Sequence, residues 1–225
     1  MTIITEHIQP LLDSRKISFA FAATLLCWCT GAAAQEHLKP GAETVAGYEE
    51  SVSHVLKGAF GPGVILNSIV EPSFEPEYAV GVQKKRDGYV VFYVVANDAV
   101  WPKLLNKEST DVGATRCEVS ISADLANKIS GIWDVFLRDL RDDEKYPGVL
   151  DGSFYYFSGE IGGKLRIGMS QDARKDSGVG KLQDVGYSMK DLCLKKDEAA
   201  ETKLDSQVND LLARLQQPPA QGISK

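Results

Sequence analysis

The chain has 225 residues, and its 31 acidic and 25 basic side chains give a formal net charge of −6. This mildly acidic balance argues against nucleic acids and against anionic membrane surfaces as partners. The length fits one domain that buries a core of its own.

The amino-terminal segment has the pattern of a bacterial signal peptide. Arg15 and Lys16 supply a basic region, and the uncharged, largely apolar run Ile17–Thr30 follows it. Ala32–Ala34 then offers the small side chains that a signal peptidase accepts, so residues 1–34 are predicted to be removed. The alternative is an uncleaved membrane anchor, but the run is shorter than the roughly 20 apolar residues of a spanning helix.

Cleavage predicts a periplasmic or secreted protein that has no stable membrane insertion, and the cysteines fit this location. Cys27 and Cys29 leave with the signal peptide, so the mature chain keeps Cys117 and Cys193. An even number of cysteines in a compartment where disulfides persist predicts a bridge between these two. The alternative is two separate buried thiols.

The mature chain begins with a polar stretch. Residues 35–46 lack any periodicity and are predicted to form a flexible leader, and residues 47–195 are predicted to form a single globular α+β domain. Apolar residues at helical spacing within Tyr48–Phe60 predict a short amphipathic helix that ends at Gly61–Gly63.

Strand patterns follow this helix. Val64–Val70 is one apolar run, and Tyr78–Lys84 and Tyr89–Ala96 flank the turn sequence Lys85–Gly88, which predicts a hairpin. The second strand of this hairpin is apolar on both faces, so it is predicted to be central and covered on both sides. Trp101 and Pro102 are predicted to lie in a loop, and a polar connection is predicted to follow them.

The next elements are a strand and the clearest helix of the chain. Ala114–Ile121 has a strand pattern, and Ser122 is a good N-cap for a helix whose apolar stripe runs from Leu125 to Leu140. A second hairpin is predicted to pair Ser153–Gly159 with Lys164–Met169.

Two further helices are predicted after the second hairpin. One spans Gly178–Leu194, and residues 196–225 form a C-terminal amphipathic helix and tail. Strands in hairpin-sized pairs, with too few helices for a series of parallel units, predict an α+β fold with a mainly antiparallel sheet and helices packed on one face. A helix-flanked β-sandwich is the alternative.

Motifs for metal, cofactor or catalytic chemistry are incomplete. His37 and His54 have no second His or Cys at ligand spacing, so no metal site is predicted. The stretch Gly178–Leu182 lacks the Ser or Thr of a phosphate-binding loop, and Gly168–Asp172 lacks the final glycine of a nucleophile elbow. No cofactor and no catalytic residue is therefore assigned.

One segment carries a resemblance to known proteins. Asp151–Phe157 reads Asp-Gly-Ser-Phe-Tyr-Tyr-Phe, between a helix that bears Trp133 and a helix that bears Cys193. Over residues 117–193 the chain resembles uncharacterised exported proteins of Gram-negative bacteria that have an Asp-Gly-x-x-Tyr-x-Phe strand in this context. Those proteins often continue with a Trp-Ser-Pro segment, where this chain has Met169–Gln171. The resemblance implies a fold more than a function.

Three classes of function remain open. The favoured class is a periplasmic protein that binds a protein partner, as inhibitors and immunity proteins do, with Trp101 and Tyr155 as candidate contacts. Core packing is the alternative for Tyr155. The second class is a hydrolase that assembles Ser170, His54 and an acid only by folding. The third is an envelope assembly factor whose Leu204–Leu215 segment packs on a partner.

Overall fold

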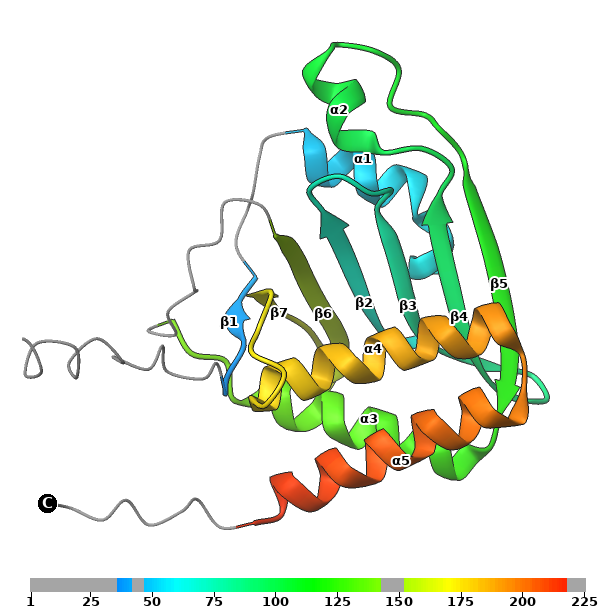
Figure 1. The fold of residues 1–225 in the computed structure, drawn as a ribbon, viewed down its shortest axis with the longest axis vertical. Coiled ribbons are helices and arrows are strands. Elements are labelled where there is room, and N and C mark those ends of the chain that lie inside the picture. Colours follow the sequence, from blue (N-terminus) through cyan, green and yellow to red (C-terminus); the bar gives the residue numbers. More distant parts are fainter. Residues whose placement is uncertain (1–35, 42–46, 143–151, 218–225) are drawn as a thin grey trace, which may run out of the picture. The chain divides into compact units, whose positions relative to one another are not determined.

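The computed structural model describes residues 36–41, 47–142 and 152–217 (Figure 1). The predicted signal peptide, residues 1–34, and Asp151 lie outside the described residues. No helix within the described ranges is both long enough and apolar enough to span a membrane.

The described chain is organised around an antiparallel sheet with the strand order β1-β7-β6-β2-β3-β4-β5. Each pair of neighbouring strands runs antiparallel, which confirms the predicted α+β class. The strands are β1 (Lys39–Pro40), β2 (Val64–Pro72), β3 (Tyr78–Lys85), β4 (Gly88–Ala96), β5 (Ala114–Ile121), β6 (Ser153–Ile161) and β7 (Lys164–Gln171).

Both predicted hairpins are present, and their turns are shorter than the sequence suggested. β3 and β4 pair until Lys85 lies opposite Gly88. β6 and β7 are joined by Gly162 and Gly163, which have φ angles of 60° and 75°. Two consecutive positive φ angles are the geometry of the tight hairpin turn that matches strand twist, and glycine adopts them without strain. The register of β6 on β7 is therefore fixed locally.

One face of the sheet carries three long helices (Figure 1). They are α3 (Ala123–Arg138), α4 (Gly178–Lys195) and α5 (Glu198–Leu215). The predicted N-cap is confirmed, because Ser122 Oγ accepts a hydrogen bond from the Leu125 N–H at 3.1 Å. Leu204 and Val208 of α5 are fully buried in the same core as Trp133. The domain therefore extends beyond residue 195, and the C-terminal helix packs on its own chain rather than being left for a partner.

Within the described residues, the opposite face is covered over β3, β4 and part of β2. The helix α1 (Tyr48–Val55), the 3₁₀ turn η1 (Lys57–Phe60) and the short helix α2 (Val100–Leu105) form this cover. Val91 and Tyr93 of β4 pack toward the three long helices, whereas Phe92 and Val94 pack toward α1 and α2. This confirms that β4 is a central strand buried on both sides.

Residues 36–41 correct the prediction of a flexible leader. Leu38 is fully buried, and β1 pairs with β7. Glu36 accepts a hydrogen bond at 2.8 Å from the first backbone N–H of α4 and forms an ion pair at 3.0 Å with Arg214 of α5. A carboxylate at a helix N-terminus is stabilising, so a few contacts dock a segment whose composition is polar.

The helix α2 takes the place of the loop that was predicted to hold Trp101 and Pro102. Glu77 is fully buried, and its carboxylate accepts hydrogen bonds from the backbone N–H groups of Val100 at 2.8 Å and Trp101 at 3.0 Å. It also accepts a hydrogen bond from the Tyr48 hydroxyl at 2.7 Å. The carboxylate that caps this helix lies more than 20 residues earlier in the sequence, so no local pattern predicts the helix.

The fold brings Cys117 and Cys193 close together as free thiols. Cys193 on α4 is buried, and Cys117 on β5 is half-buried. The Cys193 thiol lies 3.5 Å from the carbonyl oxygen of Val91 and 3.7 Å from that of Cys117. Burial raises the pKa of the Cys193 thiol, which makes it a poor nucleophile. The disulfide stays a prediction.

Candidate functional site

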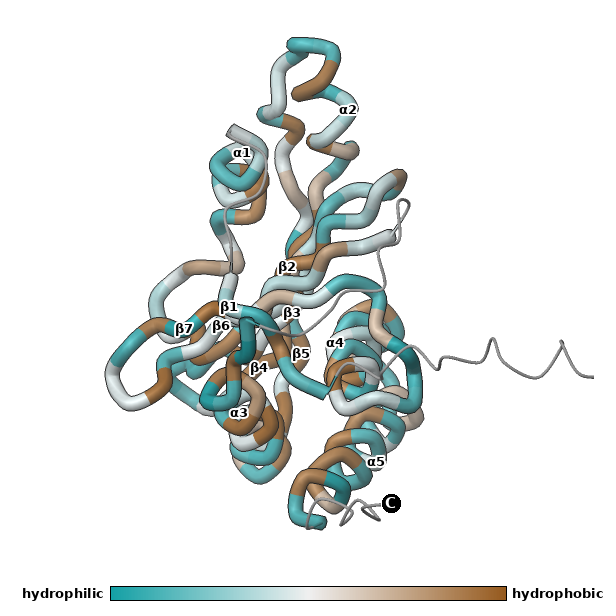
Figure 2. The backbone as a smooth tube through the Cα atoms, turned by 90° about the vertical axis from the view of Figure 1, so that its left-hand side faces the viewer, coloured by the Kyte–Doolittle hydropathy of each residue, from teal (hydrophilic) through white to brown (hydrophobic). Residues whose placement is uncertain are grey.

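Apolar side chains are exposed on the part of the sheet that the described residues of α1, η1 and α2 do not cover. On β6, Tyr155 and Phe157 face the three long helices, so Tyr156 and Ser158 face the opposite side by the alternation of a strand. Figure 2 shows α1 and α4 on opposite sides of the strands. Beyond the edge of α1 and η1, the exposed fractions of Phe60, Leu165 and Ile167 are 47%, 70% and 43%. Contiguous exposed apolar side chains of this kind mark interaction sites.

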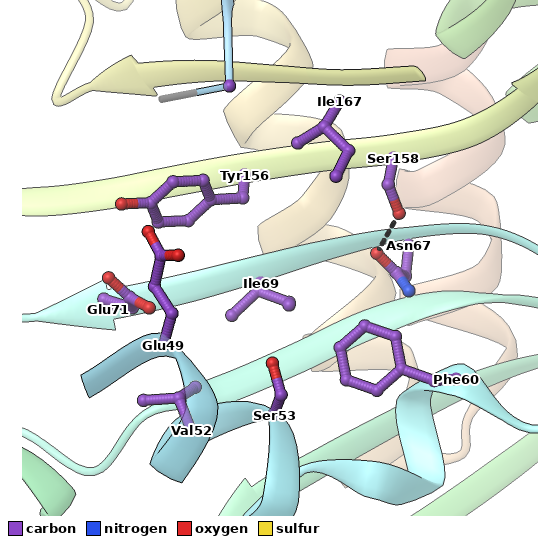
Figure 3. A pocket seen from close by; sticks show the side chains of 11 residues that line it. Glu49, Val52, Ser53, Phe60, Asn67, Ile69, Glu71, Tyr156, Ser158 and Ile167 are labelled. Carbon is purple, nitrogen blue, oxygen red and sulfur yellow. Dashed lines mark hydrogen bonds between the residues drawn. The ribbon is translucent and has the colours of Figure 1, made fainter. Parts of the chain in front are cut away.

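Two cavities of about 310 and 450 Å³ adjoin on this face and form one depression, which we call the sheet groove. It lies between α1 with η1 on one side and β2, β6 and β7 on the other (Figure 3). The residues that line both cavities are Phe60, Asn67, Ser158 and Ile167. The volumes are in the range of ligand sites.

The polar side chains in the middle of the sheet groove are held by hydrogen bonds. Ser158 Oγ donates a hydrogen bond to Asn67 Oδ1 at 2.6 Å, and Asn67 Nδ2 donates to the carbonyl oxygen of Ala59 at 3.0 Å. These bonds tie β6, β2 and η1 together across the floor of the groove. A satisfied network holds the floor rigid.

One end of the sheet groove is acidic, and we call it the acid end. Glu49 of α1, Glu71 of β2 and Tyr156 of β6 converge there (Figure 3). Glu71 is only 6% exposed. Burial first, and then repulsion from Glu49 and Glu77, raise the pKa of Glu71 to about 8, against a hydrogen bond from Tyr156 that lowers it.

The charged groups that act on Glu71 are negative. Among the described residues that line the first cavity there is no lysine and no arginine. None of the ion pairs between described residues involves Glu71. Glu77, by contrast, is held by three donors although it is equally buried. A perturbed carboxyl in a cleft is a candidate functional group, because its burial costs stability and no local structural role offsets that cost.

The aromatic residues singled out from the sequence lie outside the sheet groove. Tyr155 is 3% exposed and packs in the core, as the alternative interpretation predicted. Its hydroxyl contacts Asp172 at 3.0 Å and the Tyr187 hydroxyl at 2.5 Å. Trp101 is half-buried and packs edge-on against Tyr48, with the ring centroids 5.0 Å apart. A partner contact through Trp101 stays a prediction.

The residues named for a hydrolase are not brought together. Ser170 is fully buried on the side of the three long helices and accepts a hydrogen bond from Gln183 at 3.1 Å. His54 is exposed on α1, across the sheet. No group of three or more His, Cys, Asp or Glu side chains in the described ranges is placed to hold a metal ion.

No family model matches the chain, and no curated protein or solved structure matches it significantly. The site is therefore argued from its own geometry. Sequence reasoning missed the sheet groove, although one signal was available. Glu71 ends an apolar strand, where alternation places it on the same face as Ile69 and Asn67.

Proposed function

We propose that this chain is an exported binding protein that acts on a protein partner through the sheet groove, in the manner of an inhibitor or immunity protein. The observation that carries the proposal is the exposed apolar row of Phe60, Leu165 and Ile167 beside a rigid, partly polar floor. Protein interfaces combine an apolar centre with satisfied polar groups in this way.

A partner protein fits this surface better than an enzymatic substrate does. The groove is open along β2, β6 and β7. At its centre, Ser158 and Asn67 are hydrogen-bonded to each other. Among the described residues that line the groove, no nucleophile is seen hydrogen-bonded to a base. Binding through shape and burial requires none, because apolar area removed from water supplies the driving force.

Export supports the same proposal and has its own test. We expect the purified mature protein to begin at Gln35, because the signal peptidase cuts after Ala34. We also expect oxidation to join Cys117 to Cys193, which lowers the intact mass by about two hydrogen masses relative to the reduced chain. Intact-mass measurement of the native protein, with and without reductant, tests both. An uncleaved chain whose four cysteines are all reduced would contradict export and the bridge together.

The groove is tested by site-specific photo-cross-linking in the bacterium that encodes the chain. A p-benzoylphenylalanine at position 167 is expected to give a discrete protein adduct, because Ile167 lies at the centre of the groove. The matched control carries the same group at position 194. Leu194 is 59% exposed on α4, on the other face of the sheet. Adducts at both positions, or at neither, would contradict the proposed binding surface.

A further inference from the structure

The strand β5 forms one edge of the sheet. In the strand order of the described chain it comes last, after β4, at the end opposite β1 (Figure 1). Its eight residues, Ala114–Ile121, are paired on one side only. No backbone hydrogen bond between described residues reaches its outer side. An open edge of this kind is a template for a further strand.

The hydrogen-bond pattern shows which backbone groups of β5 face outward. The Asn97 N–H donates to the carbonyl oxygen of Gly113 at 3.1 Å, one step beyond the pair of Ala96 with Ala114. In an antiparallel pair, hydrogen-bonded and non-hydrogen-bonded positions alternate. The residues whose N–H and C=O groups point away from β4 are therefore every second one: Ala114, Arg116, Glu118 and Ser120.

We propose that the outer edge of β5 pairs with the same edge of a second copy of this chain, antiparallel and centred on Cys117. This pairing places Arg116 of each copy opposite Glu118 of the other, and Ala114 opposite Ser120. All four outward-facing residues of each strand then enter the ladder, and the two sheets become one. The dimer goes beyond the proposed function, because β5 supplies none of the residues that line the sheet groove.

Charge complementarity selects this register. The adjacent registers that use the same outward-facing groups are centred on Arg116 or on Glu118. Each of them puts two like charges directly opposite each other, which destabilises a pair of strands. The register centred on Cys117 pairs unlike charges instead, and it gives a longer ladder than either neighbour.

The same charges favour a second copy as the occupant. A strand that carries an arginine and a glutamate two residues apart is complementary to itself about a two-fold axis, as an isologous interface requires. Within one copy, Arg116 and Glu118 form an ion pair at 2.8 Å, so the two copies together would join four alternating charges. The net charge of −6 belongs to the whole chain, and charges more than about 8 Å apart are largely screened at physiological ionic strength.

The first test exchanges the two charges in the mature protein. Sedimentation equilibrium of the wild type is expected to give twice the mass of the chain. Glu118→Arg puts like charges opposite each other, as does Arg116→Glu, and each variant is expected to weaken self-association at least about tenfold. An equimolar mixture of the two variants restores unlike pairs and is expected to form a dimer again. Arg138→Glu is the control, because Arg138 forms an exposed ion pair on α3, and it should leave the mass unchanged.

The second test uses Cys117, which lies on the two-fold axis of the proposed dimer. Opposite residues of a non-hydrogen-bonded pair have Cα atoms about 4.5 Å apart, within the range of a disulfide. In Cys193→Ala, which removes the neighbouring thiol of the same chain, mild oxidation is expected to give a covalent dimer on a non-reducing gel. The control moves the thiol along the strand by combining Val119→Cys with Cys117→Ala and Cys193→Ala. Its two Cα atoms would lie about 14 Å apart, so it should stay monomeric on the gel.

The other outcomes would overturn the dimer. A monomeric wild type, a dimer that survives both charge variants, or folded variants that fail to associate when mixed would each contradict it. Equal cross-linking through positions 117 and 119 would contradict the register. Arg116 also donates to Gln83 at 2.8 Å, so circular dichroism checks the fold of Arg116→Glu, and the cysteine test decides the matter if that variant is unfolded. The photo-cross-link at position 167 tests the proposed function separately, so failure of one leaves the other standing.

Discussion

Glu71→Gln is expected to stabilise the protein at pH 7 by about 3 kcal/mol, although it changes a buried group. The folded state holds the pKa of Glu71 at about 8, far above its ordinary value of 4.5. Between these two values the unfolded chain loses the proton and the folded chain keeps it. The free energy of unfolding contributed by this group is therefore complete below pH 4.5 and is lost as the pH rises toward 8.

The pH dependence distinguishes this cause from better packing. Chemical denaturation of wild type and Glu71→Gln should show a difference below about 1 kcal/mol at pH 5 that grows steadily to pH 8. The groups that face Glu71 are Glu49 from α1, Glu77 just before β3 and the hydroxyl groups of Tyr48 and Tyr156. Glu160→Gln provides the exposed control. A difference that is constant across this range would contradict the buried charge as the cause.

Glu77→Gln, the same chemical change at the other buried glutamate, is expected to destabilise the protein by about 2–3 kcal/mol. Both oxygens of Glu77 accept hydrogen bonds, from Tyr48, Val100 and Trp101. An amide presents an N–H₂ group to at least one of these donors, which leaves a buried donor without an acceptor.

The two substitutions together test the contrast between a structural and a functional carboxyl group. The free energy of unfolding at pH 7 is measured for both variants under identical conditions. Asp98→Asn serves as the local control for Glu77, because Asp98 lies at the surface just before the same helix, where it accepts from the Ala99 N–H and pairs with Lys103. Its effect should be small, since exposed ion pairs contribute little. If Glu77→Gln and Glu71→Gln shift stability in the same direction, the contrast fails.

Elements with a local signature were predictable from the sequence. The apolar stripe behind Ser122 specified α3, and two consecutive glycines specified the turn between β6 and β7. The apolar character of both faces of Tyr89–Val95 identified the doubly covered strand. In each case, the residues that carry the sequence pattern belong to the helix, turn or strand that the pattern predicts.

Elements that depend on distant groups were not predictable in this way. The helix α2 is capped by Glu77, and residues 36–41 dock through Leu38 and through the ion pair of Glu36 with Arg214. None of these contacts can be seen in the spacing of apolar residues along the local sequence. Propensity arguments fail where a tertiary partner supplies the missing hydrogen bonds.

The sheet groove could not be predicted from the sequence, because it depends on which residues lie opposite each other in paired strands. Asn67 meets Ser158 only because β2 and β6 pair with these residues opposite each other, and Ile167 joins them through β7. Strand pairing between segments about 90 residues apart is not encoded in either segment alone. The sequence does place Glu71 at the end of an apolar run, but its approach to Glu49 follows from the packing of α1 on the sheet.

The most direct test of the acid end is the titration of the Glu71 carboxyl group, followed by ¹³C NMR and assigned with Glu71→Gln. A midpoint near pH 8 is expected in the free protein. A midpoint near the ordinary 4.5 in the free protein would contradict the account.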